Sequence, residues 1–280
     1  MNKPLTITMF HSIFKLSLIL LLFSSIACSK DTTKEEVEIE ANASGDQNDN
    51  NNAENDEESN SGDGNGNNGE QESPCSGTTS SIFSEENGLL TVEFEDAEFS
   101  GDWKLRSDGD SYSGEGYMVW EGSQSLGNPG NGIVTFELKI QNPGTYQFLW
   151  KSAVKTGNNG TEHNDSWLRF ADAQDFYAKN GESIVYPEGT GKTPNPEGAT
   201  KDGWFKIYRS GNDLDFKWQA RTFDNNAHDI FVVFENAGTY TMEVSARSSG
   251  HGIDKFVLFK EMSQQDATAD SNELSESTCD

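Results

Sequence analysis

Basic residues are scarce in this chain. It has 20 Lys and Arg residues against 47 Asp and Glu residues, which gives a formal net charge of −27 at pH 7. Proteins that bind nucleic acid neutralise its phosphates with clusters of Lys and Arg. The charge balance therefore argues against a nucleic-acid partner.

Recognised catalytic signatures are missing as well. The sequence contains no Gly-x-Ser-x-Gly elbow, no His-Glu-x-x-His zinc motif and no glycine-rich phosphate loop. His163, His228 and His251 do not stand at a recognised metal-ligand spacing. We therefore expect a protein that is not an enzyme. Because Asp and Glu are abundant, a glycoside hydrolase or polysaccharide lyase stays open as an alternative.

A hydrophobic run long enough to cross a membrane is also lacking. The apolar segment LSLILLLF (16–23) follows Lys3 and Lys15 and is shorter than the roughly 20 residues that a spanning helix needs. These features are typical of a signal peptide. The small residues that precede Cys28 resemble a lipobox, which predicts a lipoprotein signal peptide at 1–27 and a lipid on Cys28. An ordinary signal peptide that is cut nearby is the alternative.

Only three cysteines are present. If Cys28 carries a lipid, Cys75 and Cys279 can form a disulfide in an oxidising compartment. The loop that it closes would span 279 − 75 = 204 residues, and such a bridge is worth about 5 kcal/mol in the chain-entropy model. Two free thiols are the alternative.

Apolar side chains are nearly absent from residues 28–75, which are rich in Asn, Gly and acidic residues. Such a segment cannot bury enough surface to offset its ordering entropy, so it predicts a disordered tether. The acidic run after Cys28 resembles an export signal of some Gram-negative bacteria, which predicts a surface-exposed outer-membrane lipoprotein. A solvated spacer that faces the periplasm is the alternative.

Residues 76–262 show a period-two pattern of apolar and polar residues. It is visible at 90–94, 133–140, 145–153, 229–235, 239–247 and 253–260, and Gly, Asn and Pro separate the segments. No amphipathic helix longer than two turns stands out. This pattern predicts an all-β fold, a single antiparallel β-sandwich, followed by a polar C-terminal tail at 263–280.

One turn motif occurs twice, in QNPGTYQFLW (141–150) and ENAGTYTMEV (235–244). In both cases an alternating segment precedes the turn and another follows it. Asn and Gly favour tight turns. We expect two hairpins of one sandwich and no duplicated domain, because the chain is too short for two sandwiches of ordinary size.

The order of several short motifs resembles a known family. The motifs are VEFEDAEF (92–99), GEGYMVWEG (114–122), NPGTYQFLWKSA, NAGTYTMEVSARS and GHGIDKFVL (250–258). Together they resemble the β-jelly-roll carbohydrate-binding modules of families six and thirty-five, and the similar C-terminal domain of xylan-directed glucuronidases. The resemblance covers residues 90–260 and implies a jelly roll that binds a polysaccharide or oligosaccharide. The long polar segment 171–228 departs from it, because it exceeds a minimal module.

The resemblance implies a structural calcium ion. Glu93 and Glu95 stand two apart in the opening strand, opposite Leu90 and Val92, and the family pairs such residues with an Asp that corresponds to Asp254. Carboxylate oxygens are ligands that calcium prefers. A solvent-exposed polar face is the alternative reading.

Aromatic and polar residues near strand ends are the candidates for sugar contact, because sugars present flat C–H faces and many hydroxyl groups. The predicted ligand-binding residues are Trp120, Glu162, Asn164, Asp165, Trp218, Arg221, Arg247 and His251. Core packing is the alternative for each Trp, and a surface ion pair is the alternative for Arg247. We assign Trp150 to the core. Arg221 and Arg247 would suit an acidic sugar.

These features predict a non-catalytic, lipid-anchored protein that captures glycan at the cell surface. Its partners would be glycan-degrading enzymes or an outer-membrane transporter. A structural or adhesive β-sandwich that contacts protein is the main alternative.

Overall fold

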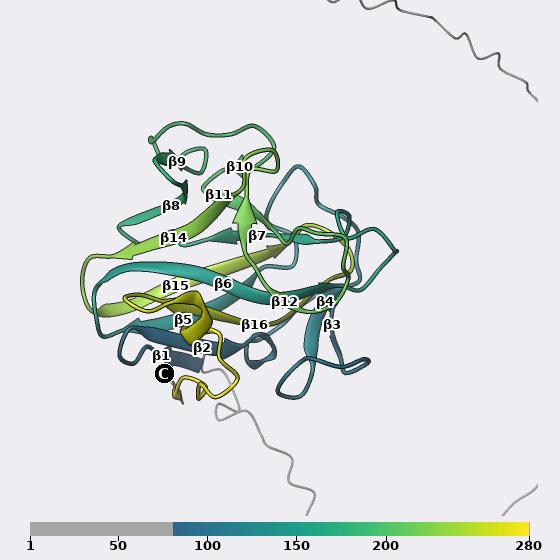
Figure 1. Cartoon of the computed structure of the whole chain (residues 1–280), viewed down its shortest axis with the longest axis horizontal. Coiled ribbons are helices and arrows are strands. Elements are labelled where there is room, and N and C mark those ends of the chain that lie inside the picture. The colour runs from purple at the N-terminus through teal and green to yellow at the C-terminus, as the bar shows by residue number, and fades with distance from the viewer. Residues whose placement is uncertain (1–80, 280) are drawn as a thin grey trace, which may run out of the picture. The chain divides into compact units, whose positions relative to one another are not determined.

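The computed structural model describes residues 81–279, all of which belong to one compact unit. The predicted signal peptide, Cys28, the acidic tether and Cys75 lie outside these residues. The described part consists almost entirely of strands and loops (Figure 1). None of its helices is both long enough and apolar enough to cross a membrane.

The strands are β1 (Ser81–Ser84), β2 (Leu89–Glu93), β3 (Trp103–Arg106), β4 (Tyr117–Trp120), β5 (Val134–Ile140), β6 (Gly144–Val154), β7 (Asp165–Arg169), β8 (Asp175–Asn180), β9 (Ser183–Val185), β10 (Thr200–Lys201), β11 (Trp204–Tyr208), β12 (Lys217–Trp218), β13 (Arg221–Thr222), β14 (His228–Phe234), β15 (Gly238–Ala246), β16 (His251–Phe259) and β17 (Ser277–Cys279). Two single turns of helix accompany them, η1 (Phe94–Asp96) and α1 (Gln264–Ala267).

The strands form two layers. The first has the order β17–β1–β5–β15–β7–β11–β10, and the second has the order β9–β8–β14–β6–β16, with β2 and β4 both paired to β16 and β3 beside β4. Strand β13 pairs with both β11 and β14 and so links the layers. Apart from the parallel pair β1–β5, the pairings are antiparallel. In Figure 1 the long strands of both layers cross the body of the molecule in similar directions. The prediction of an all-β sandwich is confirmed.

The core lies between the layers because apolar side chains alternate along the strands. In β5 the residues Val134, Phe136, Leu138 and Ile140 are at most 1% exposed, whereas Thr135 and Lys139 are exposed. Aromatic rings meet across the gap: Phe136 packs 5.0 Å from Phe256, in edge-to-face geometry. Burial of a large apolar side chain contributes about 2 kcal/mol, so these rows are the main stabilising feature of the fold. Trp150 is fully buried, as predicted.

The repeated turn motif does not form hairpins, and that prediction is wrong. Strands β5 and β6, which flank the first copy, do not pair with each other, and neither do β14 and β15, which flank the second. Instead β5 pairs with β15 and β6 pairs with β14, so each turn carries the chain from one layer to the other.

The Tyr of each copy explains why the motif recurs. Tyr146 donates its hydroxyl hydrogen bond to the carbonyl oxygen of Asn142 at 2.6 Å, and Tyr240 donates to Asn236 at 2.9 Å. Both rings pack against Phe234, with ring centroids 5.6 and 4.6 Å away. A Tyr that bonds back to the turn it has just left fixes the angle of a corner between sheets, as it does in other sandwiches.

A buried carboxylate holds the first corner. Glu85 accepts hydrogen bonds from the backbone N–H groups of Gly88 (2.5 Å), Gln141 (2.9 Å) and Asn142 (2.8 Å), and it is fully buried. Hydrogen bonds from Asn142 and these backbone groups outweigh the opposing effect of burial, so the pKa of Glu85 lies below its usual value. The carboxylate therefore ties the β1–β2 turn to the β5–β6 corner.

The polar C-terminal tail is hydrogen-bonded to the sandwich. Strand β17 pairs with β1, and the side chain of Ser275 accepts a hydrogen bond from the backbone N–H of Thr91 at 3.0 Å. Ala267 of α1 is 1% exposed. Cys279 is disulfide-bonded. Its pairing with Cys75 stays a prediction, because Cys75 lies outside the described residues.

Candidate functional site

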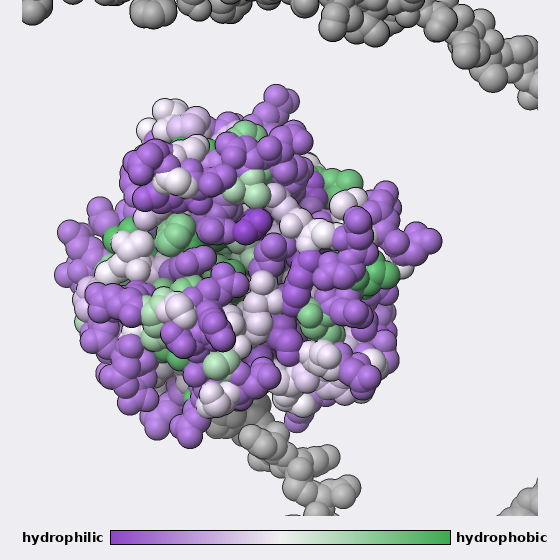
Figure 2. Space-filling model, viewed as in Figure 1, coloured by the Kyte–Doolittle hydropathy of each residue, from purple (hydrophilic) through white to green (hydrophobic). Residues whose placement is uncertain are grey.

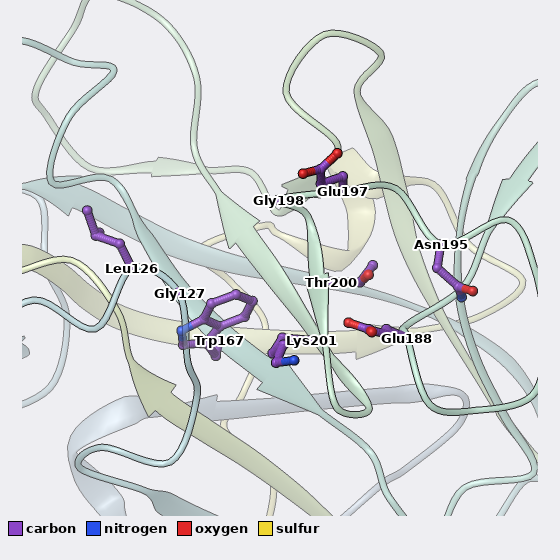
Figure 3. A pocket seen from close by; sticks show the side chains of 9 residues that line it. All are labelled: Leu126, Gly127, Trp167, Glu188, Asn195, Glu197, Gly198, Thr200 and Lys201. Atoms are coloured by element: carbon purple, nitrogen blue, oxygen red, sulfur yellow. The ribbon is translucent and has the colours of Figure 1, made fainter.

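A pocket of about 430 Å³ opens on the outer face of the first layer (Figure 3). Its volume falls in the range of small-molecule binding sites. It lies between two long connections, β4–β5 and β9–β10, and the strands β7 and β10. The lining residues are Leu126, Gly127, Trp167, Glu188, Asn195, Glu197, Gly198, Thr200 and Lys201.

Strand alternation directs Trp167 to this face. Its neighbours Ser166 and Leu168 point toward the core side of β7, so Trp167 stands on the opposite face between Asp165 and Arg169. The next strand, β11, places Lys206 directly beside Trp167, and β10 lies beyond β11. The strand residues that line the pocket are Trp167 of β7 and Thr200 and Lys201 of β10.

Trp167 is only 2% exposed, so its ring face is not open to a ligand. Its role is to hold the surrounding segments in place. Its Nε1 donates a hydrogen bond to the carbonyl oxygen of Ser125 at 3.0 Å, which holds the β4–β5 connection over the ring. The neighbouring Leu126 is 50% exposed and supplies apolar surface to the pocket. A ligand would therefore meet one aliphatic side chain among polar groups.

An ion pair supports Trp167 from the side. The Arg247 guanidinium lies 5.3 Å from the centre of the Trp167 ring and forms an ion pair with Asp165, whose other oxygen accepts a hydrogen bond from Ser248. The side chains of Arg247 and Asp165 are only 12% and 8% exposed. The sequence predicted both as ligand-binding residues. The structure brings them together beside the pocket, and neither lines it.

The other wall is a loop that is hydrogen-bonded to itself. Asn195 Nδ2 donates to the carbonyl oxygens of Tyr186 (3.0 Å), Pro187 (3.0 Å) and Lys192 (2.8 Å). The backbone N–H of Gly203 donates to the carbonyl oxygen of Glu188 at 2.7 Å and ties the loop to the β10–β11 turn. These bonds give a 14-residue connection, 186–199, a defined shape.

Asn164 and His251, also predicted to bind ligand, are buried near Asp165. Asn164 Nδ2 donates to the carbonyl oxygen of Arg209 at 2.5 Å, and His251 Nδ1 lies 2.9 Å from the hydroxyl of Ser166. Burial, with a further contribution from the charge of Arg209, lowers the pKa of His251 to about 3, so this His is neutral at physiological pH. His251 is 0% exposed, and direct contact with a ligand does not fit this burial.

Trp120, which was predicted to bind ligand, is enclosed by the protein. It is 3% exposed, its Nε1 donates to the carbonyl oxygen of Ser123 at 2.9 Å, and its ring packs edge-on against Trp103. An enclosed ring of this kind offers no face to a sugar. It belongs to the core because both faces of β4 are covered.

Three predicted ligand-binding residues lie away from the pocket. Trp218 is half-buried against the core on β12, and Arg221 forms a 3.2 Å ion pair with Asp229. Glu162 is exposed in the β6–β7 connection. Their role in binding stays a prediction.

The three predicted metal-binding residues converge on the segment 113–116. Glu93 Oε2 accepts from the Ser113 hydroxyl at 3.0 Å, Asp254 accepts from the Ser113 backbone N–H at 2.8 Å, and Glu95 accepts from the backbone N–H groups of residues 115 and 116. Glu93 is 4% exposed, so these carboxylates do not form an exposed polar face. The strand also ends at Glu93, and Glu95 lies in η1.

Burial perturbs the protonation of Glu93 and Glu95. Burial, with a contribution from the charge of Glu93, raises the pKa of Glu95 to about 8, and burial also raises the pKa of Glu93. Lys151 forms a 2.9 Å ion pair with Asp254, and Lys255 lies 4.0 Å from Glu93. Between residues 81 and 279, no set of three or more His, Cys, Asp or Glu side chains has an arrangement that could hold a metal ion as it stands.

The sequence did not predict the pocket residues Leu126, Trp167, Glu188, Asn195 and Glu197. One signal pointed toward the β9–β10 wall: the segment 171–228 exceeds a minimal module. Its loop contacts depend on residues far apart in the chain, and no local pattern encodes them.

No family model and no curated protein matches this chain. Similar solved structures include a GH26–CBM35 β-(1,4)-mannanase from Podospora anserina, with 16% identity over 64% of this chain and 29% of that chain, at a TM-score of 0.36. Another is the CBM35 of Abf62 from Cellvibrio japonicus (12% identity, 62% and 94% coverage, TM-score 0.35). A third is the C-terminal CBM6 of the marine enzyme LamC from Zobellia galactanivorans (14%, 61% and 99%, 0.27).

Carbohydrate-binding modules of families 35 and 6 are the families that the sequence motifs resemble. The chain spans less than a third of the mannanase. At these low identities and TM-scores, the likeness does not assign a function to this chain.

Proposed function

We propose that this protein is a non-catalytic, polysaccharide-binding lipoprotein and that the pocket beside Trp167 takes the glycan. The observation that carries the proposal is the pocket itself, whose walls combine the exposed Leu126 with the polar groups of Asn195, Thr200, Lys201 and two Glu residues. A sugar needs both kinds of contact, because it has apolar C–H faces and many hydroxyl groups. The motif order in the sequence supports the same class of ligand.

The character of the surface argues against the adhesive alternative. Polar side chains dominate the face shown in Figure 2, and apolar ones are scattered over it. The large apolar side chains that are exposed within residues 81–279 are Leu105, Leu126, Ile133 and Leu274. A surface that docks a protein through apolar contact needs a contiguous patch of several hundred Å².

A hydrolase is the second candidate, and one observation favours it. Glu188 and Glu197 line the same pocket, and glycoside hydrolases use a pair of carboxylates. Release of new reducing ends by the purified protein would establish this alternative.

The setting of the protein follows from the sequence. Lipid on Cys28 would anchor it to the outer membrane, and the tether would hold the sandwich about 35 Å from the anchor. Many copies on one surface would retain a polymer through avidity and present it to glycan-degrading enzymes or a transporter.

We also propose that calcium binds among Glu93, Glu95 and Asp254. The donor chemistry supports this, because the ligands would be carboxylate oxygens and the hydroxyl of Ser113. Glu95 Oε2 is buried and has no hydrogen-bond partner, and a cation would neutralise the crowded charges. Chelation with EDTA is then expected to lower the Tm, because the ion binds only the folded state. Equal melting curves in EDTA and in calcium would contradict this site.

The main test is affinity electrophoresis of the purified protein through gels that contain plant and algal polysaccharides. Retardation by one class of glycan, without cleavage, is expected. Leu126→Ala should reduce it, whereas Leu105→Ala is the matched control, because Leu105 is 44% exposed and does not line the pocket. Trp218→Ala in the same gels tests the predicted Trp218 platform. If no glycan retards the wild-type protein, the proposal fails.

A further inference from the structure

The charged groups at the pocket are unequally paired, and this bears on the kind of sugar. On the same outer face, Arg247 pairs with Asp165, Arg169 pairs with Glu243 at 2.5 Å, and Lys206 pairs with Asp224 at 2.5 Å. Each cation that surrounds Trp167 is thus already neutralised by a carboxylate of the protein.

The two carboxylates of the pocket, in contrast, have no partner within the described part of the protein. Glu188 and Glu197 are exposed, and within residues 81–279 their side chains form no ion pair and no hydrogen bond. The one cation in the lining, Lys201, lies 3.7 Å from Asp202, which does not line the pocket. Figure 3 shows Glu188 and Glu197 on the wall that faces Leu126 and Trp167. The free charge available to a ligand is therefore negative.

The uncharged polar groups of the pocket are also acceptors. Asn195 uses its Nδ2 donor group on three loop carbonyls, which leaves Oδ1 free. The Thr200 hydroxyl points its proton toward the carbonyl oxygen of Pro196, at 3.4 Å, which leaves its lone pairs free. A pocket rich in acceptors suits a ligand rich in donors.

The net charge of the whole domain also favours a positively charged ligand. Residues 81–280 contain 16 Lys and Arg against 33 Asp and Glu, so their net charge is 16 − 33 = −17. Such a surface repels a polyanion and attracts a polycation at low ionic strength. Arg221 and Arg247, which suited an acidic sugar in the sequence, are both occupied by Asp partners.

We infer that the pocket binds a glycan of amino sugars, in which a protonated primary amine lies against Glu188 and Glu197. The inference rests on the proposed function and names the ligand class of the same site. An ammonium group combines positive charge with three donors, and it matches free carboxylates and amide oxygens better than a hydroxyl does.

The test compares four oligosaccharides of equal length by isothermal titration calorimetry with the purified protein. They are the β-(1,4)-linked tetramers of glucosamine, N-acetylglucosamine and glucose, and a galacturonic acid tetramer. The glucosamine tetramer should bind about tenfold more tightly than the other three, at pH 6 and low salt. Added salt should weaken this advantage, because charge provides it.

Variants separate the pocket from a general effect of charge. Glu188→Gln and Glu197→Gln should each remove most of the tenfold preference for the amine. Glu182→Gln changes the net charge equally at an exposed residue outside the pocket, and should leave the preference intact.

The possible failures are distinguishable. If the glucose or N-acetylglucosamine tetramer binds as tightly as the amine, and Leu126→Ala weakens that binding, the proposed function stands and the amino-sugar inference is overturned. Preferential binding of the galacturonic acid tetramer overturns it as well. Equal loss in Glu182→Gln and the two pocket variants would show general attraction only. If none of the tested glycans binds, here or in the gels, both proposals fall.

Discussion

Removal of either partner of the ion pair between Asp165 and Arg247 should cost the fold several kcal/mol, although most ion pairs on protein surfaces contribute little. Both side chains are nearly buried, at 8% and 12% exposure, and the buried Nε of Arg247 has no hydrogen-bond partner. Asp165→Ala would leave the guanidinium buried without its carboxylate. Loss of one partner of a buried pair costs about 3–5 kcal/mol, most of it for the charge that stays behind.

A double-mutant cycle measures this coupling directly. Asp165→Ala, Arg247→Met and the double variant are unfolded in urea beside the wild-type protein, and ΔG is extrapolated to water. We expect each single variant to lose about 3 kcal/mol or more. The double variant should lose clearly less than the sum, because it leaves no charge unpaired, with a coupling energy of about 2 kcal/mol.

The outcome also bears on the pocket, because Arg247 lies against Trp167. If the pair holds Trp167 in place, both single variants should weaken glycan binding more than the conservative Arg247→Lys does. A coupling energy below about 0.5 kcal/mol would refute the reasoning, since it would mean that water screens the pair as it does at an open surface.

Three further predictions concern stability. Replacement of Glu85 by Gln puts an NH2 group against buried N–H donors, so it should cost about 2–4 kcal/mol in urea unfolding; a loss below about 0.5 kcal/mol would exclude the corner role. The pKa of His251 is lowered from 6.5 to about 3 on folding, so the unfolded state binds more protons between these values and stability falls as the pH drops below about 6.5. The slope attributable to His251 is about 1.4 kcal/mol per pH unit, and His251→Gln should remove it; equal pH slopes in both proteins would contradict the assignment. Tyr146→Phe should lose about 1 kcal/mol, and Tyr240→Phe, whose side chain is more exposed, should lose less; the reverse order would mean that burial does not set the strength of these corners.

The positions of the main strands could be predicted from the sequence. The alternating segments at 133–140 and 239–247 became β5 and β15 with boundaries within one residue, because a strand that is buried on one face must alternate. The core role of Trp150 followed from the same phase. The placement of neither turn motif could be predicted, because a turn fits equally well between paired strands and between layers, and only strand pairing distinguishes the two.

The candidate site was predictable only in part. Asp165 and Arg247 stood out as polar residues at strand ends, and tertiary structure decided that they pair with each other beside the pocket. Trp120 and Trp167 look alike in the sequence, since both are aromatic residues in short strands. The indole of Trp120 is hydrogen-bonded to the connection that follows its own strand, whereas that of Trp167 is hydrogen-bonded to a connection 42 residues away in the chain. A local pattern records which side of a strand a residue faces, but not what covers that side.

The sequence by itself determined the strands, the alternation that builds the core and the net negative charge, since each depends on composition or near neighbours. Only the tertiary structure decided that the chain changes layers at the two Asn-x-Gly-Thr-Tyr corners. It also placed Leu126, Glu188 and Glu197 around Trp167 and paired the nearby Arg and Lys side chains with carboxylates of the protein. These features join residues that are distant in the chain, and their contacts exist only once the two layers have packed.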